Sequence, residues 1–288
     1  MYGCDNFCSY CIVPYVRGRE RSRDASDIID EVKALLNDGV KEVMLLGQNV
    51  NSYGTKLENS ISFAQLLDKV ASINGLSQVR FMTSHPKDFS DELIEVIKNN
   101  KKVARHIHLP LQSGSNKVLL DMNRKYTKER YLDLAFKIRD NIEDVAISTD
   151  IIVGFPTETS EDFLETIDVI EKVKFEQVFT FVYSKRTGTK ASMMENVSTE
   201  EEIKNRFDKL LEVTKIVGEK QYQKNVGKTF VGLVEEEDTL DGYLTARLSN
   251  NALVHFKGDK SLIGEYVKLE LNESKGFYYN GSIKDWFK

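Results

Sequence analysis

The chain has 288 residues, of which 41% are hydrophobic and 30% are charged, and its net charge at pH 7 is −5. This composition is typical of a globular protein and excludes a membrane-spanning one, since no apolar run reaches the width of a bilayer. The first residues do not form a signal peptide, so we expect a cytoplasmic protein without a membrane partner. The negative net charge excludes a surface that is basic throughout, although a local basic patch is sufficient for nucleic-acid binding.

The first feature along the chain is the cluster of Cys4, Cys8 and Cys11, which are all of its cysteines. A disulfide would leave one thiol over and suits an oxidising compartment, and three unrelated buried thiols would not be so closely spaced. A zinc site needs a fourth ligand, and the histidines all lie far along the chain, at His85, His106, His108 and His255. An iron–sulfur cluster on three thiolates leaves one iron free to bind a small molecule. The residues favour this cluster, with zinc and a disulfide as weaker alternatives.

Arginines at alternate positions follow the cysteines, at Arg17, Arg19, Arg21 and Arg23. In an extended segment, alternation places all of these side chains on one side, next to the cysteines. Such a row can hold RNA phosphates or a cofactor carboxylate through forked hydrogen bonds, and the alternative is a solvated face. We predict the binding role.

Strand-like and helix-like segments then alternate along most of the chain. The predicted strands are 41–46, 78–83, 104–109, 145–152 and 176–182. Helical periodicity marks 26–38, 61–73, 90–99, 127–141 and 160–173. This alternation predicts a parallel sheet with helices packed outside it. We expect a closed or partly closed barrel, because no glycine-rich dinucleotide motif follows the early strands.

Polar, turn-forming segments follow the predicted strands, at 47–54, 84–86, 110–115, 154–159 and 183–189. Because parallel strands end at the same rim of a barrel, these loops are expected to form one site there. His106 and His108 share one face of their strand. They either line this pocket or pack as hydrogen-bonded core residues.

A long helix over 199–224 is predicted by a capping box at Thr199 and Glu202 and by apolar residues at helical spacing. Short β-rich segments follow at 229–234, 242–248, 252–256, 263–271 and 277–283, and they predict a small antiparallel β-barrel of about five strands. We divide the chain into a first domain of residues 1–219 and a barrel of residues 220–288. Side chains typical of RNA loop recognition occur in this barrel, at Tyr243, Arg247, Asn250, Asn251, His255 and Lys257.

The spacing Cys4-x3-Cys8-x2-Cys11 is that of the radical S-adenosylmethionine enzymes. The segments GCDNFCSYCIVPYVRGRERSR, LLGQNVNSYG, RFMTSHP, HLPLQSGS, MNRKYT and DIIVGFPTET resemble the methylthiotransferase family within that superfamily, and ARLSNNALVHFKGD resembles its RNA-binding TRAM domain. YCIVPYVRGRE with LLGQNVNSYG is most similar to the members that methylthiolate isopentenylated adenosine beside the tRNA anticodon. The resemblance implies an α/β fold, in which a partial (β/α)6 TIM-like barrel precedes a TRAM-like β-barrel.

The resemblance further implies a 4Fe–4S cluster on Cys4, Cys8 and Cys11 that binds S-adenosylmethionine, with no catalytic residue beyond these ligands. It assigns contacts with S-adenosylmethionine to Tyr10, Gly47, Gln48, Gln112, Ser113, Ile152, Val153 and Gly154. The protein would position the cofactor, which carries the radical chemistry. The implied substrate is tRNA, the implied electron donor is a flavodoxin or a ferredoxin, and the expected state is a monomer.

Members of the resembled family carry an N-terminal domain ahead of this region, with three further cysteines for a second, auxiliary 4Fe–4S cluster. This chain contains no such cysteines. We therefore expect Met1 to be an internal methionine or a truncation point, and complete methylthiolation to need the missing domain. Alternative substrates are threonylcarbamoyl-adenosine in tRNA and an aspartate of a ribosomal protein. A non-catalytic RNA-binding module with a metal cluster is the alternative from another class.

Overall fold

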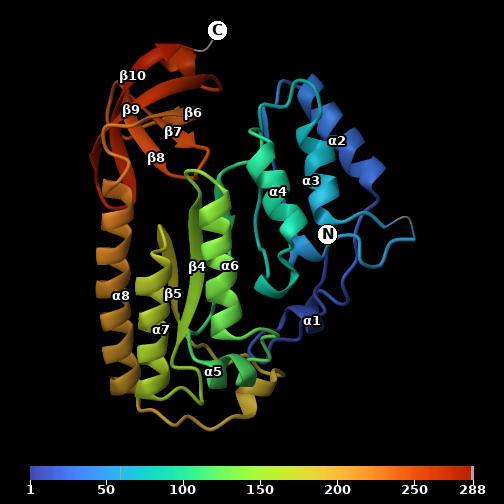
Figure 1. Ribbon diagram of the computed structural model, residues 1–288, viewed down its shortest axis with the longest axis vertical. Coiled ribbons are helices and arrows are strands. Elements are labelled where there is room, and N and C mark those ends of the chain that lie inside the picture. Colours follow the sequence, from blue (N-terminus) through green and yellow to red (C-terminus); the bar gives the residue numbers. More distant parts are fainter. Residues whose placement is uncertain (59, 287–288) are drawn as a thin grey trace.

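The computed structural model describes residues 1–58 and 60–286, and Figure 1 shows parallel strands and helices with a small barrel at one end. The elements before the small barrel are, in chain order and with η for a 3₁₀ helix, α1 (Val13–Val16), α2 (Ala25–Asn37), β1 (Glu42–Leu45), η1 (Val50–Ser52), α3 (Phe63–Ala71), β2 (Gln78–Phe81), η2 (Pro86–Asp88), α4 (Asp91–Asn99), β3 (His106–His108), α5 (Asn116–Asp121), α6 (Lys128–Asn141), β4 (Ala146–Val153), α7 (Ser160–Val173), β5 (Gln177–Val182), η3 (Lys190–Met193) and α8 (Glu200–Gln223).

The strands predicted for the first part of the chain are confirmed, and they pair in parallel. β1 pairs with β2, and β4 lies between β3 and β5. A single parallel bridge from Val79 to Val103 links the first pair to the segment that leads into β3. Together β1 to β5 form an incomplete barrel, here called the half-barrel. Its strands end at a common rim, which is where the loops of a site are expected.

One face of the half-barrel is apolar and buried under the helices. Residues at alternate positions of its strands belong to a single core cluster, among them Val43, Val79, Ile107, Ile147 and Ile151. Helices α3, α4, α6 and α7 contribute their own buried apolar residues to the same cluster. Because side chains alternate along a strand, the residues between these core positions point to the opposite face.

The predicted helices are confirmed, and several begin at side-chain caps. The capping box of Thr199 and Glu202 starts α8 as predicted, and further capping boxes start α3 and α7. Helices α1 and α5 were not predicted, because their four and six residues are too few to show a period. Within the described residues, no helix is both long and apolar enough to cross a bilayer.

The small barrel consists of β6 (Thr229–Glu237), β7 (Tyr243–Leu248), β8 (Leu253–Lys257), β9 (Tyr266–Ser274) and β10 (Tyr278–Trp286), with η4 (Lys260–Leu262) between β8 and β9. It is closed in the order β10-β8-β7-β6-β9. All neighbours are antiparallel except β8 and β10, which are parallel. The wholly antiparallel barrel of the sequence prediction is therefore corrected at one pair. A ring of five strands cannot alternate in direction all the way round, so closure requires a parallel pair.

A buried arginine joins the half-barrel to the small barrel. The guanidinium of Arg80 on β2 donates to the carbonyl oxygens of Leu248 (3.0 Å) and Ser249 (3.2 Å) and to the carboxylate of Glu42 (2.5 Å). The hydroxyl of Ser249 also accepts the backbone N–H of Arg105 (3.1 Å). Because Arg80 is buried, these bonds are shielded from water and hold the first residues of the strands against the small barrel.

Replacing Arg80 by alanine is expected to lower the free energy of unfolding by about 3 kcal/mol, because Glu42 and two carbonyl groups would lose a shielded partner. Urea unfolding followed by circular dichroism measures this loss. Arg130→Ala is the matched control, since Arg130 is exposed on α6. A loss for Arg80→Ala no larger than that of the control would contradict the role assigned to Arg80.

Candidate functional site

The cysteine loop, residues 3–12, begins with a glycine that the fold requires. Gly3 has a φ of +71°, and a Cβ there would lie 2.2 Å from the carbonyl oxygen of Arg19. The N–H of Cys4 donates to the carbonyl oxygen of Gly18 (3.3 Å). The arginine segment therefore folds back over the start of the loop and sets the position of Cys4.

The rest of the cysteine loop is held by α5 and η3, which come from distant parts of the chain. The N–H of Ser9 donates to the oxygen of Met122 (3.0 Å), and the oxygen of Ser9 accepts the N–H of Ala191 (2.8 Å). The side-chain amide of Asn123 donates to the oxygen of Phe7 (2.8 Å). These bonds place the loop at the end of the molecule where α1 and α5 lie, away from the small barrel (Figure 1).

All cysteines of the loop are free thiols, which excludes the disulfide alternative. Burial, and after it the neighbouring Cys8 and Cys11, raise the pKa of Cys4, and burial followed by Cys8 raises the pKa of Cys11. Without iron the thiols of Cys4 and Cys11 therefore hold their protons, which iron binding would displace. Among the described residues, no three His, Cys, Asp or Glu side chains are arranged around a single ion. A cluster needs a different arrangement, because each of its thiolates binds a separate iron.

Arg124 is a site residue that the sequence interpretation missed. Its guanidinium donates to the sulfur of Cys8 (3.4 Å), to the oxygen of Pro110 (3.1 Å) and to the hydroxyl of Tyr126 (3.0 Å). It also lies over the ring of Tyr126, with 5.2 Å between the guanidinium carbon and the ring centroid. The segment MNRKYT already contained this arginine. Its contact with Cys8 could not be read from the sequence, because the two residues are far apart along the chain.

The predicted row of arginines is exposed but partly paired within the protein. Arg19 forms an ion pair with Asp5 (2.7 Å), and Arg23 forms one with Glu31 (2.5 Å). Arg17 and Arg23 line a cavity of about 550 Å³ beside β1 and α2. Gly47 and Gln48, predicted to contact S-adenosylmethionine, line the same cavity. Binding of RNA or of the cofactor by these residues stays a prediction.

The other predicted cofactor residues form two groups, and the side chains of only the first group lie at the rim. Tyr10 and Ile152 pack against one small apolar cluster with Phe155 and Met122. Gln112 is bound through its backbone to β4, since its N–H donates to Asp150 (2.8 Å) and its oxygen accepts the N–H of Ile152 (2.9 Å). The structure thus brings Tyr10, Gln112 and Ile152 to one region of the rim.

Ser113 and Val153 point elsewhere. The hydroxyl of Ser113 is buried and lies 3.5 Å from the hydroxyl of Thr166 on α7. The side chain of Val153 belongs to the core on the helix-covered face of the half-barrel. Only the backbone of Val153 therefore reaches the rim, and a contact of either residue with the cofactor stays a prediction.

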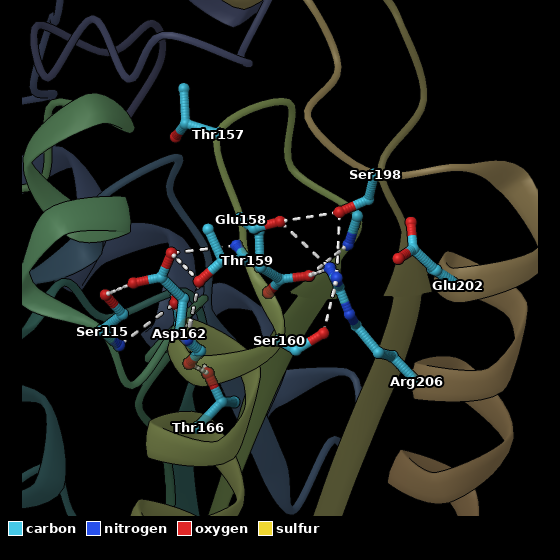
Figure 2. Close-up of polar contacts among 12 residues, drawn as sticks. Ser115, Thr157, Glu158, Thr159, Ser160, Asp162, Thr166, Ser198, Glu202 and Arg206 are labelled. Atoms are coloured by element: carbon cyan, nitrogen blue, oxygen red, sulfur yellow. Dashed lines mark hydrogen bonds and ion pairs between the residues drawn. The ribbon is translucent and has the colours of Figure 1, made fainter.

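Gly154 is held by a buried carboxylate, which Figure 2 shows together with its partners. The N–H of Gly154 donates to Oε2 of Glu158 (2.7 Å), and Arg206 of α8 donates to the backbone oxygen of Glu158 (3.0 Å). Gly154 has a φ of +73°, and a Cβ there would lie 2.7 Å from the side chain of Ile203. A side chain at this position would therefore clash with α8, and a contact of Gly154 with the cofactor stays a prediction. Burial raises the pKa of Glu158 to about 7.

A second carboxylate joins α5 to α7 beside this loop (Figure 2). Asp162 accepts hydrogen bonds from the hydroxyl of Ser115 (2.6 Å), from Lys117 (2.8 Å) and from the N–H of Thr159 (2.9 Å). Burial acts in the opposite direction, but these bonds lower the pKa of Asp162 to about 2. The ionised carboxylate therefore fixes the loops that follow β3 and β4 relative to each other.

The predicted RNA-binding residues of the small barrel are only partly available to a ligand. Arg247 pairs with both oxygens of Glu235 (2.6 and 2.9 Å), and His255 pairs with Asp238. Asn250 and Asn251 form the turn between β7 and β8, where Oδ1 of Asn250 accepts the N–H of Ala252 and Asn251 has a φ of +72°. Lys257 is exposed and Tyr243 is half-buried. Their role in RNA binding stays a prediction.

Two family models match the chain, in the order of its two parts. The Radical SAM superfamily model matches residues 1–170, and the TRAM domain model matches residues 223–284. The chain belongs to the radical SAM superfamily. This membership agrees with a three-cysteine loop at the rim of a half-barrel, and it implies a 4Fe–4S cluster and S-adenosylmethionine as cofactors.

Curated relatives of this radical SAM protein share about half of its residues. A protein of Lachnoclostridium phytofermentans named tRNA-2-methylthio-N(6)-dimethylallyladenosine synthase is 57% identical over 286 residues, which cover 99% of this chain and 63% of the relative. A protein of the same name from Thermoanaerobacter pseudethanolicus is 51% identical, over 98% of this chain and 60% of the relative. The chain thus spans somewhat less than two thirds of the length of the curated relatives it matches.

Solved radical SAM structures share the fold at low sequence identity. Coproporphyrinogen III oxidase from Escherichia coli matches with a TM-score of 0.55 and 11% identity, over 94% of this chain and 65% of that one. A radical S-adenosylmethionine methyltransferase from Kitasatospora setae, TsrM, matches with a TM-score of 0.54 and 15% identity, over 85% of this chain and 40% of that one. These likenesses support the α/β half-barrel and nothing finer.

Glu158→Gln is expected to change how stability depends on pH. The folded-state pKa of about 7 lies above the ordinary value of 4.5, so the folded protein binds more protons than the unfolded chain between these values, and Glu158 makes the wild-type protein less stable as pH rises. The variant lacks this loss. Its free energy of unfolding relative to the wild type should therefore increase by about 3 kcal/mol from about pH 5 to about pH 8.

Urea unfolding at a series of pH values measures this difference. The control is Glu161→Gln, because Glu161 is exposed at the start of α7 and its pKa is lowered by hydrogen bonds to the helix backbone and to Thr159. Its difference from the wild type should be constant over the same range. A flat difference for Glu158→Gln as well would show that the buried carboxylate does not titrate there.

Proposed function

We propose that this chain is the S-adenosylmethionine-cleaving and RNA-binding part of a tRNA methylthiotransferase that acts on N6-dimethylallyladenosine. The observation that carries the proposal is the cysteine loop, in which three free thiols lie at the rim of the half-barrel with Arg124 bonded to Cys8. The names of the relatives support the substrate. They favour dimethylallyladenosine over threonylcarbamoyl-adenosine and over a ribosomal-protein aspartate.

The residues of the loop suit a cluster with one open iron. When bound, it supplies the site for the amino and carboxylate groups of S-adenosylmethionine and the electron that breaks the sulfonium bond. Cys4, Cys8 and Cys11 would hold it. The guanidinium of Arg124 donates to the sulfur of Cys8 and would keep this contact with the sulfur that binds the cluster.

Other residues of the rim would hold S-adenosylmethionine and exclude water from it. Tyr10 and Ile152 offer apolar surface from one cluster. Gly154 offers its backbone, in a position set by the bond from its N–H to Glu158. Gly47 and Gln48 approach from the end of β1. Each is a cofactor contact in this proposal, and none donates or accepts a proton in it.

The partners follow from the same chemistry. The TRAM domain would hold the tRNA, with Lys257 as an exposed cation. A flavodoxin or a ferredoxin would supply the electron. The protein would act in the cytoplasm as a monomer. Sulfur insertion would use a second 4Fe–4S cluster. All cysteines of this chain lie in the one loop, so the ligands of a second cluster would come from polypeptide outside it.

Anaerobic reconstitution with iron and sulfide is expected to give a brown protein that converts S-adenosylmethionine to 5′-deoxyadenosine under dithionite. Cys8→Ala should lose both the colour and the product, because one iron would lose its thiolate. Arg130→Ala, on the exposed face of α6, should keep both. Chromatography measures the product and metal analysis measures iron and zinc. Zinc in place of iron, or a brown wild-type protein without product, would refute the enzymatic proposal in favour of a metal-containing RNA-binding module.

Deleting the gene for this protein is expected to remove 2-methylthio-N6-dimethylallyladenosine from the tRNA of its source organism, while N6-dimethylallyladenosine accumulates. Mass spectrometry of digested tRNA measures both nucleosides. A plasmid copy with intact cysteines should restore the modification, and a Cys8→Ala copy should not. Unchanged modification in a strain without a second such gene would refute the substrate.

A further inference from the structure

The inner face of the half-barrel, opposite the helices, carries a chain of polar side chains that no step above uses. His106 and His108 alternate with Ile107, which lies in the core, so both imidazoles point to the inner face. On β4, Ser148 and Asp150 alternate in the same way with Ile147 and Ile151. β3 and β4 are paired in parallel, with His108 opposite Ser148.

These side chains form a connected series of contacts. Nε2 of His106 and Nδ1 of His108 each lie 2.9 Å from the hydroxyl of Ser148. Nε2 of His108 lies 3.4 Å from the carboxylate of Asp150. The first three residues are buried, whereas the side chain of Asp150 is 26% exposed. Asp150 is therefore the end of the series that a ligand can reach.

One arrangement of protons satisfies all of these contacts. Nε2 of His108 lies 3.4 Å from the carboxylate of Asp150, so a proton on that nitrogen makes an attractive contact with an oxygen that can only accept. Nδ1 of His108 is then an acceptor for the hydroxyl of Ser148, which in turn accepts the N–H of His106. Burial lowers the pKa of His106 to about 3, which agrees with a neutral ring. The hydrogen bonds run from His106 through Ser148 to His108, and the carboxylate of Asp150 beside His108 is the acceptor that a ligand can reach.

Apolar side chains of the neighbouring strand β5 lie beside Asp150 on the same face, and Met44 of β1 adds to the exposed apolar surface of the half-barrel. Phe179 of β5 lies directly opposite Asp150, and Phe181 lies opposite Ile152. The rings of Phe179 and His108 are in edge contact, with 5.8 Å between their centroids. Phe179 is 38% and Phe181 is 50% exposed, and Met44 of β1 is 46% exposed. A carboxylate acceptor thus stands beside exposed apolar surface.

We propose that this inner face is the recognition site for the modified base, in which Asp150 accepts the N6–H of the adenine and Phe179 and Phe181 contact its N6-alkyl group. The inference rests on the proposed function and names the residues that would select its substrate. The base has an N–H donor and an apolar branch on the same nitrogen, which matches an acceptor flanked by aromatic rings. A threonylcarbamoyl group would bring a carboxylate toward Asp150, and the two negative charges would repel each other.

The test measures the affinity of the reconstituted chain for anticodon stem-loop RNAs that differ only at the target base. The first RNA carries N6-dimethylallyladenosine. The second carries adenosine, which lacks the alkyl group, and the third carries N6,N6-dimethyladenosine, which lacks the N6–H. Wild-type protein is expected to bind the first RNA about tenfold more tightly than either of the others. Fluorescence anisotropy under anaerobic conditions gives the dissociation constants.

Asp150→Asn is expected to weaken binding of the dimethylallyl RNA about tenfold, because an amide whose oxygen faces Nε2 of His108 presents its NH2 to the N6–H. It should leave the N6,N6-dimethyl RNA unaffected. Phe181→Ala should remove the preference for the dimethylallyl RNA over the adenosine RNA. The ring of Phe181 is half-exposed, so we expect this variant to fold. Asp133→Asn makes the same chemical change on the exposed surface of α6 and should alter none of the affinities.

Two outcomes would overturn the inference. One is equal affinity of the wild type for all the RNAs. The other is an equal loss by Asp150→Asn and Phe181→Ala on every RNA, which would indicate a structural role. Cleavage of S-adenosylmethionine is measured on the same samples. If cleavage persists while the RNAs are not distinguished, this inference fails and the proposed function stands, whereas absent cleavage in a brown protein refutes the function itself.

Discussion

The bond from the N–H of Gly154 to the buried carboxylate of Glu158 is the contact on which the arrangement of the rim depends. β4 is the central strand of its sheet, and Gly154 is the residue at which the chain leaves it. Arg206 ties the same turn to α8, which runs the length of the half-barrel to the small barrel (Figure 1). Glu158 thereby links the turn beside the cysteine loop to the helix that leads into the small barrel.

The length of α8 also bears on how far the small barrel lies from the rim of the half-barrel. α8 has 24 residues, so its length is about 36 Å at the rise of an α-helix. The small barrel contacts the first residues of the strands through Arg80, whereas the cysteine loop lies beyond their last residues. The small barrel therefore lies at the opposite end of the strands from the cysteine loop (Figure 1). In the proposed function it holds the RNA at a distance, and the choice of base falls to the half-barrel.

The half-barrel separates its tasks by face. Side chains on the helix-covered face form the core, whereas the inner face bears the side chains of His106, His108, Ser148 and Asp150. Polar groups on the inner face form hydrogen bonds with one another, so burying them lowers the stability of the fold only a little. The strand periodicity that builds the core therefore also aligns the groups available to a ligand.

Periodicity and spacing in the sequence were sufficient for the strands, most helices, the small barrel and the cysteine cluster, because these depend on residues close together in the chain. They were insufficient for contacts between distant segments. Arg124 at Cys8, Glu158 at Gly154 with Arg206 behind it, and the parallel pair of β8 and β10 arise only when the strands are assembled. Several residues predicted to bind a ligand, such as Ser113 and Arg247, are already bonded within the protein.

By itself, the sequence determined most of the helices and strands and named the candidate residues for binding iron, since local pattern and side-chain chemistry decide both. Only the tertiary structure decided which side chains face one another, because that depends on the register of the strands and on the closure of the two barrels.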